Sequence, residues 1–501
     1  MSLRRSLIAI VVVLGFAASI VAARHTDTTT VTRFATAPFA SRPYASHSTT
    51  SVTTTWYCPG VPASGPTVGG QFVIGNPTTV AITGTITYLG PEGTVPITAP
   101  VTVAPRDELR LDAQQAMTAP IVAATIELQG GEGLVEQRAQ DPAGQAVASC
   151  TTETSSTWYL ADGWTRGTST DQLIISNPYS DNIAVNIAFF TAKSKREPGP
   201  LQGASIAPHS VRVISIEDSG FAGESVIGVQ VVAERGRVIV AREQHYALDR
   251  AHDNGDGRVG FSLAMAAPTP SDQVWFVEGD HGTDITEQYV ILNPTNEDVA
   301  VDLVVLGIPV TNGYAQPDSI SVPANQVVTF DTKDITGLPD GPHSMVFSTL
   351  VSPSTGSAKV VIERVLTKPS GGGPVTTVVM GMTSEYVVPR WYVPIGVDTP
   401  TEGAIVVYNP DQVDKTIAIK AIGPGGEVAV PGQEAVPLPA AATRTIDLTD
   451  PSLLGKMLVI EGSARIFVER KLPRGADLPG RSGSWALPEC GPCNFSSPPS
   501  S

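Results

Sequence analysis

Residues 173–189 read Leu-Ile-Ile-Ser-Asn-Pro-Tyr-Ser-Asp-Asn-Ile-Ala-Val-Asn-Ile-Ala-Phe. An apolar run ends at Asn177-Pro178, and in the following run every second residue from Ile183 to Phe189 is apolar. A period of two residues is that of a β-strand with one face in a protein core. Proline cannot donate to a sheet ladder, and asparagine can hydrogen-bond the backbone locally. The stretch therefore predicts two strands joined by a turn at Asn-Pro.

Three landmarks, of which Asn-Pro is one, recur four times in the same order. The first is an aromatic pair that begins at Trp56, Trp158, Trp275 and Trp391. The second is the Asn-Pro turn, at Asn76, Asn177, Asn293 and Asn409. The third is an apolar strand with Glu and Arg side by side or nearly so, and its acidic members are Glu136, Glu243, Glu363 and Glu469. The Asn-Pro turns are 101, 116 and 116 residues apart (177 − 76, 293 − 177 and 409 − 293). Four similar domains are predicted.

The fold class that this pattern predicts is all-β. Six or seven short strands in about 100 residues are typical of an antiparallel sandwich of immunoglobulin-like size. A four-bladed propeller is the alternative for a fourfold repeat, but its blades need only about 40–50 residues. We therefore expect four tandem immunoglobulin-like β-sandwiches after one N-terminal hydrophobic helix. The expected segments are 1–23 (signal anchor or signal peptide), 24–53 (stalk), 54–150, 151–255, 271–368 and 388–475 (sandwich repeats), and 476–501 (tail).

The N-terminus predicts export. Arg4 and Arg5 precede an uncharged stretch, residues 7–23, whose length lies between that of a signal-peptide core and that of a spanning helix. It is either an uncleaved membrane anchor or a signal peptide cleaved after 21–23. The Thr/Ser-rich residues that follow predict an extended stalk. Both alternatives place the repeats outside the cytoplasm, on a single-pass membrane protein or a secreted one.

Composition and charge exclude some partners. The chain has 501 residues and a net charge of −16, spread along its length. Such a surface opposes nucleic acid, so no nucleic-acid partner is expected.

The four cysteines should be oxidised in an exported chain. Three pairings exist; we favour Cys58–Cys150, across the ends of repeat one, and Cys490–Cys493 as a local loop in the tail. The tail also carries Trp485, which resembles the start of a fifth unit. We expect this segment to add a strand to the fourth domain; the alternative is that Cys490 or Cys493 reaches back to Cys58.

The landmarks are interpreted mainly as structural. Neighbouring side chains on a strand point to opposite faces. One aromatic residue of each pair should therefore fill the core, while the other faces outward or packs on the next domain. By the same geometry, Glu363 and Arg364 should not pair with each other, but bond a turn or the next domain. An exposed aromatic face could instead stack on a sugar.

No catalytic residue, metal ligand set or cofactor is predicted. The seven histidines are scattered, and no nucleophile elbow, zinc-protease motif or phosphate loop is found. Residues 253–257 resemble part of a calcium loop, but Leu263 stands where the closing Glu should be. A polar linker is the preferred interpretation, and we predict that the protein is not an enzyme.

The residues Ser-Thr-Trp-Tyr-Leu-Ala-Asp-Gly (156–163), Leu-Ile-Ile-Ser-Asn-Pro (173–178) and the Glu/Arg strand together resemble an uncharacterised family of actinobacterial envelope proteins. The resemblance covers about residues 52–490 and implies tandem sandwiches behind an N-terminal hydrophobic segment. In that pattern, Arg242-Glu243 is a reversed pair and Gln137 interrupts the pair of Glu136 and Arg138. The resemblance implies no activity. We expect a non-catalytic envelope scaffold or display protein, anchored through residues 7–23, with envelope proteins or cell-wall glycan as partners. The alternative is a glycan-binding module that uses exposed aromatic residues; any binding surface is expected outside the repeated motifs.

Overall fold

The computed structural model describes residues 53–65, 67–130, 133–248, 257–308, 319–349, 351–352, 356–371, 373–395, 403–474 and 480–489. The chain divides into two compact units, Met1–Ser41 and Arg42–Ser501, and all described residues lie in the second. The predicted N-terminal helix, nearly all of the stalk, the 253–256 part of the calcium-like loop, and Cys490 and Cys493 lie outside the described residues. In the described part, no helix is both long and apolar enough to cross a membrane.

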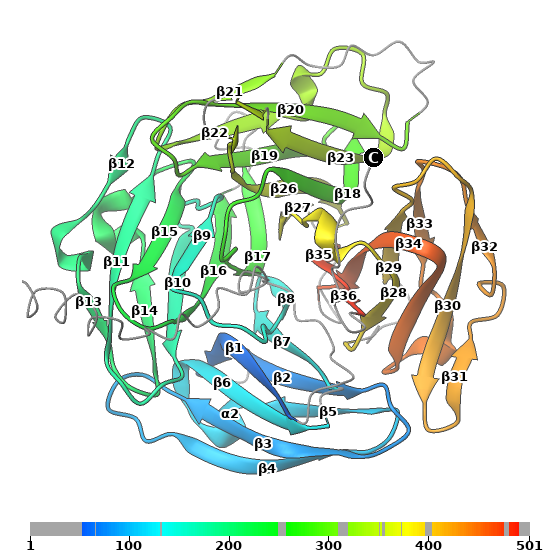
Figure 1. Cartoon of the computed structure of the whole chain (residues 1–501), viewed down its shortest axis with the longest axis horizontal. Coiled ribbons are helices and arrows are strands. Elements are labelled where there is room, and N and C mark those ends of the chain that lie inside the picture. The colour runs from blue at the N-terminus through cyan, green and yellow to red at the C-terminus, as the bar shows by residue number, and fades with distance from the viewer. Residues whose placement is uncertain are drawn as a thin grey trace, which may run out of the picture. The chain divides into compact units, whose positions relative to one another are not determined.

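The second unit is built of antiparallel sheets (Figure 1), which confirms the predicted all-β class. Sandwich 1 has sheets in the orders β1-β6-β3-β4 and β5-β2-β7-β8. Its elements are β1 (Thr53–Ala63), β2 (Gly69–Asn76), β3 (Ile82–Leu89), β4 (Ile97–Val103), β5 (Asp107–Asp112), α2 (Ala113–Ala116), β6 (Ala119–Gln129), β7 (Leu134–Asp141) and β8 (Gly144–Ser149).

Sandwich 2 repeats this plan with sheets in the orders β12-β11-β15-β9, to which β13 is added, and β14-β10-β16-β17. Its strands are β9 (Thr157–Leu160), β10 (Thr170–Asn177), β11 (Ile183–Phe190), β12 (Lys195–Arg196), β13 (Ala204–Ile206), β14 (Ser210–Ser215), β15 (Gly228–Ala233), β16 (Ile239–Leu248) and β17 (Arg258–Met265). Two short helical turns are η1 (Gly199–Leu201) and η2 (Glu217–Phe221).

Sandwich 3 has sheets in the orders β18-β23-β20-β21 and β22-β19-β26-β27. Its elements are β18 (Gln273–His281), β19 (Thr286–Asn293), β20 (Val299–Leu306), β21 (Ile320–Val322), β22 (Gln326–Asp331), η5 (Thr332–Asp334), β23 (Gly341–Thr349), the β24 (Val351–Ser352) and β25 (Gly356–Ser357) pair, β26 (Val361–Ser370) and β27 (Gly373–Met380).

Sandwich 4 differs because one long strand, β34 (Met457–Pro473), takes part in both of its sheets. The first part of β34 pairs with β30 and β28, and the second with β29 and β35. The other elements are η6 (Ser384–Tyr386), β28 (Val388–Val393), β29 (Ala404–Tyr408), β30 (Lys415–Gly423), β31 (Gly426–Ala429), β32 (Val436–Leu438), β33 (Thr443–Asp447), η7 (Pro451–Leu453), β35 (Arg481–Trp485) and β36 (Leu487–Pro488).

In three sandwiches, a strand near the C-terminal end of the domain lies in a segment that the sequence leaves outside the repeats. These strands are β17, β27 and β35, and each pairs with the Glu/Arg strand of its own sandwich. The tail thus adds β35 to sandwich 4, and β36 also pairs with β28, as the preferred interpretation of the Trp485 segment expects.

The four sandwiches contact one another in a closed cycle. The final strands carry this cycle: β8 contacts β17, β17 contacts β27, β27 contacts β35, and β35 contacts β8. Figure 1 shows them near the centre of the second unit. A cavity of about 40 Å³ remains among them, lined by residues 147–149, 263–265, 378–380 and 483–485. It has room for a few water molecules at most, so the centre is essentially packed.

Hydrophobic clusters continue from one sandwich into the next. Phe261 and Leu263 of sandwich 2 belong to the core cluster of sandwich 1, and Val277 and Val379 of sandwich 3 to that of sandwich 4. Leu134 of sandwich 1 clusters with Tyr392 of sandwich 4. Apolar burial therefore closes the cycle without a covalent link between sandwiches 1 and 4.

Candidate functional site

The recurring Glu and Arg residues occupy two fixed register positions in the sheet. The first lies opposite the residue three before the Asn of each Asn-Pro turn, and the second lies opposite the residue four before it. Glu136 lies opposite Val73, and Glu363 opposite Val290. We call these register positions the Glu position (Glu136, Ala241, Glu363, Glu469) and the Arg position (Gln137, Arg242, Arg364, Arg470). Glu243 and Arg138 lie outside both. The interpretation of Arg242-Glu243 as a reversed pair, and of Gln137 as an insertion before Arg138, is therefore wrong.

The Arg position of one sandwich pairs with the Glu position of the next. Arg242 of sandwich 2 binds Glu363 of sandwich 3, with Nη2–Oε1 and Nη1–Oε2 distances of 2.9 and 3.3 Å. Neither side chain is exposed. The same two-point contact joins Arg364 to Glu469, and Arg470 to Glu136. The last pair connects sandwich 4 to sandwich 1. As predicted, adjacent Glu and Arg residues do not pair with each other; they bond neighbouring sandwiches.

Each carboxylate in these pairs also accepts backbone N–H groups that follow the aromatic pair of the preceding sandwich. Glu363 Oε2 accepts from Ala161 and Asp162 at 2.7 and 2.6 Å. Glu469 Oε2 accepts from the Glu278 N–H at 2.9 Å. Glu136 Oε2 accepts from the Ile395 N–H at 3.1 Å. Buried carboxylates are tolerated when they are both paired and hydrogen-bonded, and these contacts meet that requirement.

Burial and opposite charge act against each other within the pairs. Burial disfavours the charge on Arg242 and Arg364, but the carboxylates of Glu363 and Glu469 raise the pKa of these guanidinium groups above the ordinary value. Both arginines are therefore charged at every pH at which the protein folds. They act as fixed electrostatic links.

The contact between sandwiches 1 and 2 lacks this ion pair. Its Arg position is Gln137 and its Glu position is Ala241, so both charges are absent together. The Gly60 N–H donates instead to Gln137 Oε1 at 3.2 Å, within sandwich 1. Apolar residues of both sandwiches, among them Ile121 and Ile174, form a buried cluster here. Hydrophobic packing therefore replaces the charged link, while the amide of Gln137 bonds within its own sandwich.

The aromatic pairs divide between core and interface. The tryptophans that begin three of the pairs, Trp56, Trp158 and Trp391, are at most 1% exposed and lie in the cores. Tyr159 is half-buried and bridges through its backbone to Ala267, and Trp275 bridges in the same way to Met382. Trp275 thus corresponds to the second aromatic residue of the other pairs, and Val274 fills the core position. The landmark alignment that sets Trp275 beside Trp56, Trp158 and Trp391 is therefore shifted by one residue.

The second aromatic residue faces the next sandwich. Trp275 of sandwich 3 stacks on Phe467 of sandwich 4, with ring centroids 5.2 Å apart, and also contacts Tyr408. Tyr57 of sandwich 1 packs on the cluster that contains the core of sandwich 2. The division between core and neighbouring domain is the one expected from strand geometry.

All four Asn side chains of the Asn-Pro turns are fully buried and make equivalent bonds. Asn177 Nδ2 donates to the carbonyls of Asp181, Ile206 and Ala207, and its Oδ1 accepts from the Tyr179 N–H at 3.0 Å. The remaining three, Asn76, Asn293 and Asn409, repeat this pattern. The amide shapes the turn locally, as expected, and also binds a second loop about 30 residues later.

Cys58 and Cys150 form a disulfide, the pairing that the sequence favours, with Cα atoms 4.6 Å apart. Cys58 is therefore not available to Cys490 or Cys493. The bond joins the two ends of sandwich 1 beside its contact with sandwich 2.

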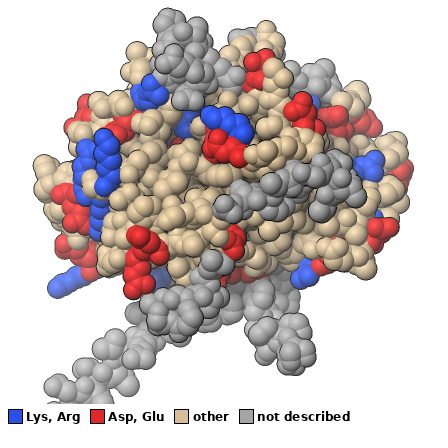
Figure 2. All heavy atoms as spheres, turned by 90° about the horizontal axis from the view of Figure 1, so that it is seen from above, with Lys and Arg blue, Asp and Glu red and all other residues tan. Residues whose placement is uncertain are grey.

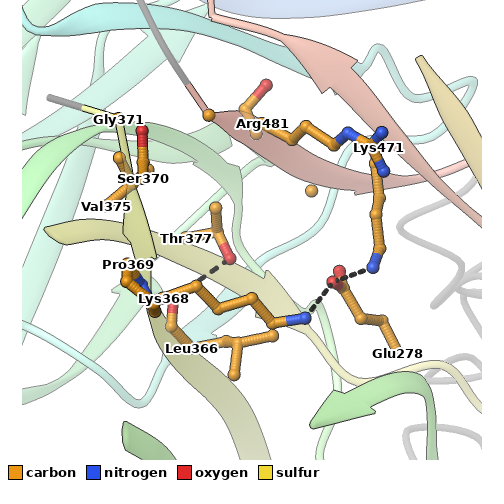
Figure 3. A pocket seen from close by; sticks show the side chains of 13 residues that line it. Glu278, Leu366, Lys368, Pro369, Ser370, Gly371, Val375, Thr377, Lys471 and Arg481 are labelled. Carbon is orange, nitrogen blue, oxygen red and sulfur yellow. Dashed lines mark hydrogen bonds and ion pairs between the residues drawn. The ribbon is translucent and has the colours of Figure 1, made fainter. Parts of the chain in front are cut away.

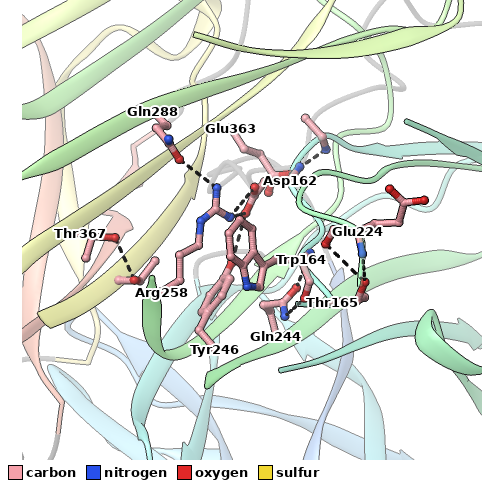
Figure 4. Close-up of polar contacts among 12 residues, drawn as sticks. Asp162, Trp164, Thr165, Glu224, Gln244, Tyr246, Arg258, Gln288, Glu363 and Thr367 are labelled. Carbon is pink, nitrogen blue, oxygen red and sulfur yellow. Dashed lines mark hydrogen bonds and ion pairs between the residues drawn. The ribbon is translucent and has the colours of Figure 1, made fainter. Parts of the chain in front are cut away.

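A buried polar cluster adds to the contact between sandwiches 2 and 3 (Figure 4). Arg258 on β17 donates to Asp162 at 2.8 Å and to Gln288 on β19 at 3.1 Å. Its guanidinium lies 4.1 Å from the centroid of the Trp164 ring, and the Tyr246 hydroxyl donates to Asp162 at 3.2 Å. All these groups come from non-repeating positions, so the repeat pattern gave no signal for them.

Two carboxyl groups of sandwich 2 have raised pKa values. Burial raises the pKa of Asp171 well above 3.8, although the charge of Arg242 and a bond from the Trp164 backbone N–H act in the opposite direction. Burial also raises the pKa of Glu243 to about 7, and the charge of Asp141 adds to this. In the described part of the chain, no three His, Cys, Asp or Glu residues are grouped as a metal site requires.

A cavity of about 530 Å³, lined in part by charged groups, lies between sandwiches 3 and 4 (Figure 3). Lys368 and Lys471 converge there on Glu278, at 3.4 and 2.6 Å. Burial opposes the charge of Glu278, but the two lysines and Arg364 hold its pKa well below the ordinary value. Arg481 also lines the cavity. None of these residues was predicted from the sequence, because they do not recur in the other sandwiches.

Residues 113–256 and 247–452 each match the family of unknown function DUF5719. The chain belongs to this family. The first DUF5719 match runs from α2 of sandwich 1 to just before β17 of sandwich 2, and the second runs from the end of β16 through sandwich 3 to η7 of sandwich 4. No protein in a comparison with curated sequences matches the chain.

Proposed function

We propose that this DUF5719 protein is a non-catalytic scaffold or display protein of the cell envelope. The observation that carries the proposal is the use of the recurring polar residues. At three contacts between sandwiches, the Arg and Glu positions form buried ion pairs, and every Asn of the Asn-Pro turns holds two loops together. What recurs is therefore an assembly device, which supports a role in holding surfaces in fixed positions.

Three features support a place outside the cytoplasm. The Cys58–Cys150 disulfide is typical of an oxidising compartment. The hydrophobic residues 7–23 and the resemblance to actinobacterial envelope proteins favour membrane anchoring or secretion. The partners that we propose are other envelope components.

The surface is suited to protein contacts rather than to one charged polymer. On the face shown in Figure 2, acidic and basic side chains lie in small mixed groups between wide uncharged areas. Large apolar side chains are exposed on several sandwiches, including Val95, Val304 and Val428 on three different ones. Sugar stacking on Trp56, Trp158 or Trp391 has no support, because these rings have no exposed face.

Site-specific photo-crosslinking in cells tests the proposal. A photoreactive amino acid is placed at Val95, Val304 or Val428, which are 79, 43 and 62% exposed. We expect at least one position to capture the same envelope protein in independent experiments, only after irradiation. The matched control carries the crosslinker at the exposed, polar Asp218 of sandwich 2. Absence of any specific product from all three positions would contradict the scaffold proposal.

A further inference from the structure

We propose that the cavity between sandwiches 3 and 4 binds a small, hydroxyl-rich ligand that carries one oxyanion, either a carboxylate or a phosphate. This inference goes beyond the scaffold function and does not rest on it. The volume of about 530 Å³ lies within the range of small-molecule sites, about 300–1,000 Å³.

The charge of the cavity wall favours an anion. Three basic side chains, Lys368, Lys471 and Arg481, line it against the carboxylate of Glu278. Lys368 also pairs with Asp280, which lies outside the lining, at 2.6 Å. Among the residues that line the cavity, basic groups therefore outnumber acidic ones, and anions are attracted to such a wall.

Hydrogen-bond donors also exceed acceptors. An ammonium group has three N–H donors, and the Lys471 ammonium contacts one carboxylate oxygen of Glu278 at 2.6 Å. Among the described residues, Arg481 has a single acidic partner, Asp447, at 3.3 Å, and Asp447 is 61% exposed. Charge-assisted bonds to an oxyanion can therefore form at Arg481 and Lys471 without breaking a buried pair.

The rest of the wall suits the body of a polyol. Ser370, Thr377 and Ser482 bring hydroxyl groups, while Leu366 and Val375 supply apolar surface for C–H groups. No aromatic side chain lines the cavity, so hydrogen bonds and charge, rather than ring stacking, would hold the ligand.

The cavity is preformed by the contact between the sandwiches. The Glu278 N–H bonds Glu469, and the Arg364 guanidinium donates to the Glu278 backbone carbonyl and pairs with Glu469. Gly480 and Gly483 approach Val375 and Val379 so closely that an added Cβ would lie 3.0 and 3.2 Å from their methyl groups. These contacts fix the two hairpins that form the walls, and preorganisation lowers the entropic cost of binding.

Isothermal titration of the exported chain with three probes tests the proposal. We expect glucuronate, glucose 6-phosphate or both to bind, and neutral glucose to bind at least about tenfold more weakly. Binding of glucuronate alone identifies a carboxylate ligand, and binding of glucose 6-phosphate alone a phosphate ligand. Each result supports the proposal. Failure of both anionic probes to bind, or equal binding of glucose, overturns it.

Two variants locate the site. Arg481→Gln should weaken the anionic probes about tenfold, while Arg444→Gln, on an exposed arginine of the same sandwich, should change nothing. Lys471→Gln should weaken binding too. Thermal unfolding identifies any variant that does not fold. If Lys471→Gln does not fold, the test rests on Arg481→Gln, whose side chain is 32% exposed in the wild type. Unchanged affinity in Arg481→Gln overturns the assignment to this cavity.

Discussion

Arg364 of sandwich 3 and Glu469 of sandwich 4 form a two-point ion pair in which neither side chain is exposed to solvent. The two residues are 105 positions apart in the chain. Equivalent pairs join sandwiches 2 and 3, and sandwiches 4 and 1. The sandwiches are therefore joined by buried ion pairs, and we expect that breaking one link affects its neighbours.

Replacement of Arg364 by Met should destabilise the protein by about 3–5 kcal/mol, because it leaves Glu469 buried without its cation. Chemical denaturation of the purified chain measures the change. The control, Arg444→Met, removes an exposed arginine and should cost at most about 1 kcal/mol. Adding Glu469→Leu to Arg364→Met should restore most of the loss; no recovery would mean that the carboxylate is not the source of the penalty.

A fourth ion pair can be installed between sandwiches 1 and 2. Gln137→Arg or Ala241→Glu alone should destabilise the protein, because each buries an unpaired charge at a position that is fully buried. Together the two substitutions should destabilise the protein by less than the sum of their separate effects, with a favourable coupling energy of roughly 0.5–3 kcal/mol. A cycle with the uncharged pair Gln137→Met and Ala241→Gln should show coupling near zero. Additive effects in the charged cycle would contradict the register assignment.

Asp171→Asn should change how stability depends on pH. Burial raises the pKa of Asp171 well above 3.8, so the folded state holds a proton that the unfolded state releases as the pH rises above about 4. Wild-type stability is therefore lost as the pH rises towards the folded pKa, by up to about 1.4 kcal/mol per pH unit. The variant should lack this loss and gain on the wild type as the pH rises above about 4. Denaturation midpoints at several pH values test this, with the exposed Asp218→Asn as control; parallel curves would refute it.

Removal of the disulfide should weaken sandwich 1. Cys58 and Cys150 are separated by 92 residues, and bonds that close loops of this size typically stabilise by about 2–4 kcal/mol. The double variant Cys58→Ser/Cys150→Ser should unfold at a lower temperature than the wild type. A reductant should lower the unfolding temperature of the wild type but not that of the variant, which no longer has this bond. Mass mapping without reductant should find no free thiol at Cys58 or Cys150 in the wild type. Alkylation of either would disprove the pairing.

Ala441→Gly should stabilise sandwich 4. Ala441 has a φ of 52°, a left-handed conformation that costs an alanine roughly 1–2 kcal/mol. Glycine adopts it freely but loses more entropy on folding, so the net gain should be about 0.5–1 kcal/mol. The neighbouring Ala440→Gly is the matched control and should not stabilise. Thermal unfolding distinguishes the two.

Part of the fold could be read from the chain because its signals are local. Alternating apolar residues after Asn177 and Asn293 mark strands with one buried face, and Asn-Pro marks the turns. The strands β17 and β27 were missed, because they lie innermost and most of their residues are buried on both faces. Burial on both faces removes the period of two that identifies a strand.

The candidate sites were harder to predict because two residues that are adjacent in sequence need not occupy the expected positions in the sheet register. Arg242 and Glu243 look like a pair, yet the sheet places Ala241 at the Glu position. A shift of one residue moves a side chain to the other face of a sheet. Lys368, Lys471 and Arg481 carry no repeat signal, and they meet only where two sandwiches come together.

The sequence by itself determined the all-β class, the fourfold repeat, the turn role of the asparagines and the favoured partner of Cys58, since these depend on local pattern or on chain ends. Only the tertiary structure decided that the sandwiches close into a cycle and that Arg and Glu of different sandwiches pair. An ion pair requires two groups within a few ångströms of each other. Arg470 and Glu136 meet across 334 residues, and no local pattern encodes a contact over that distance.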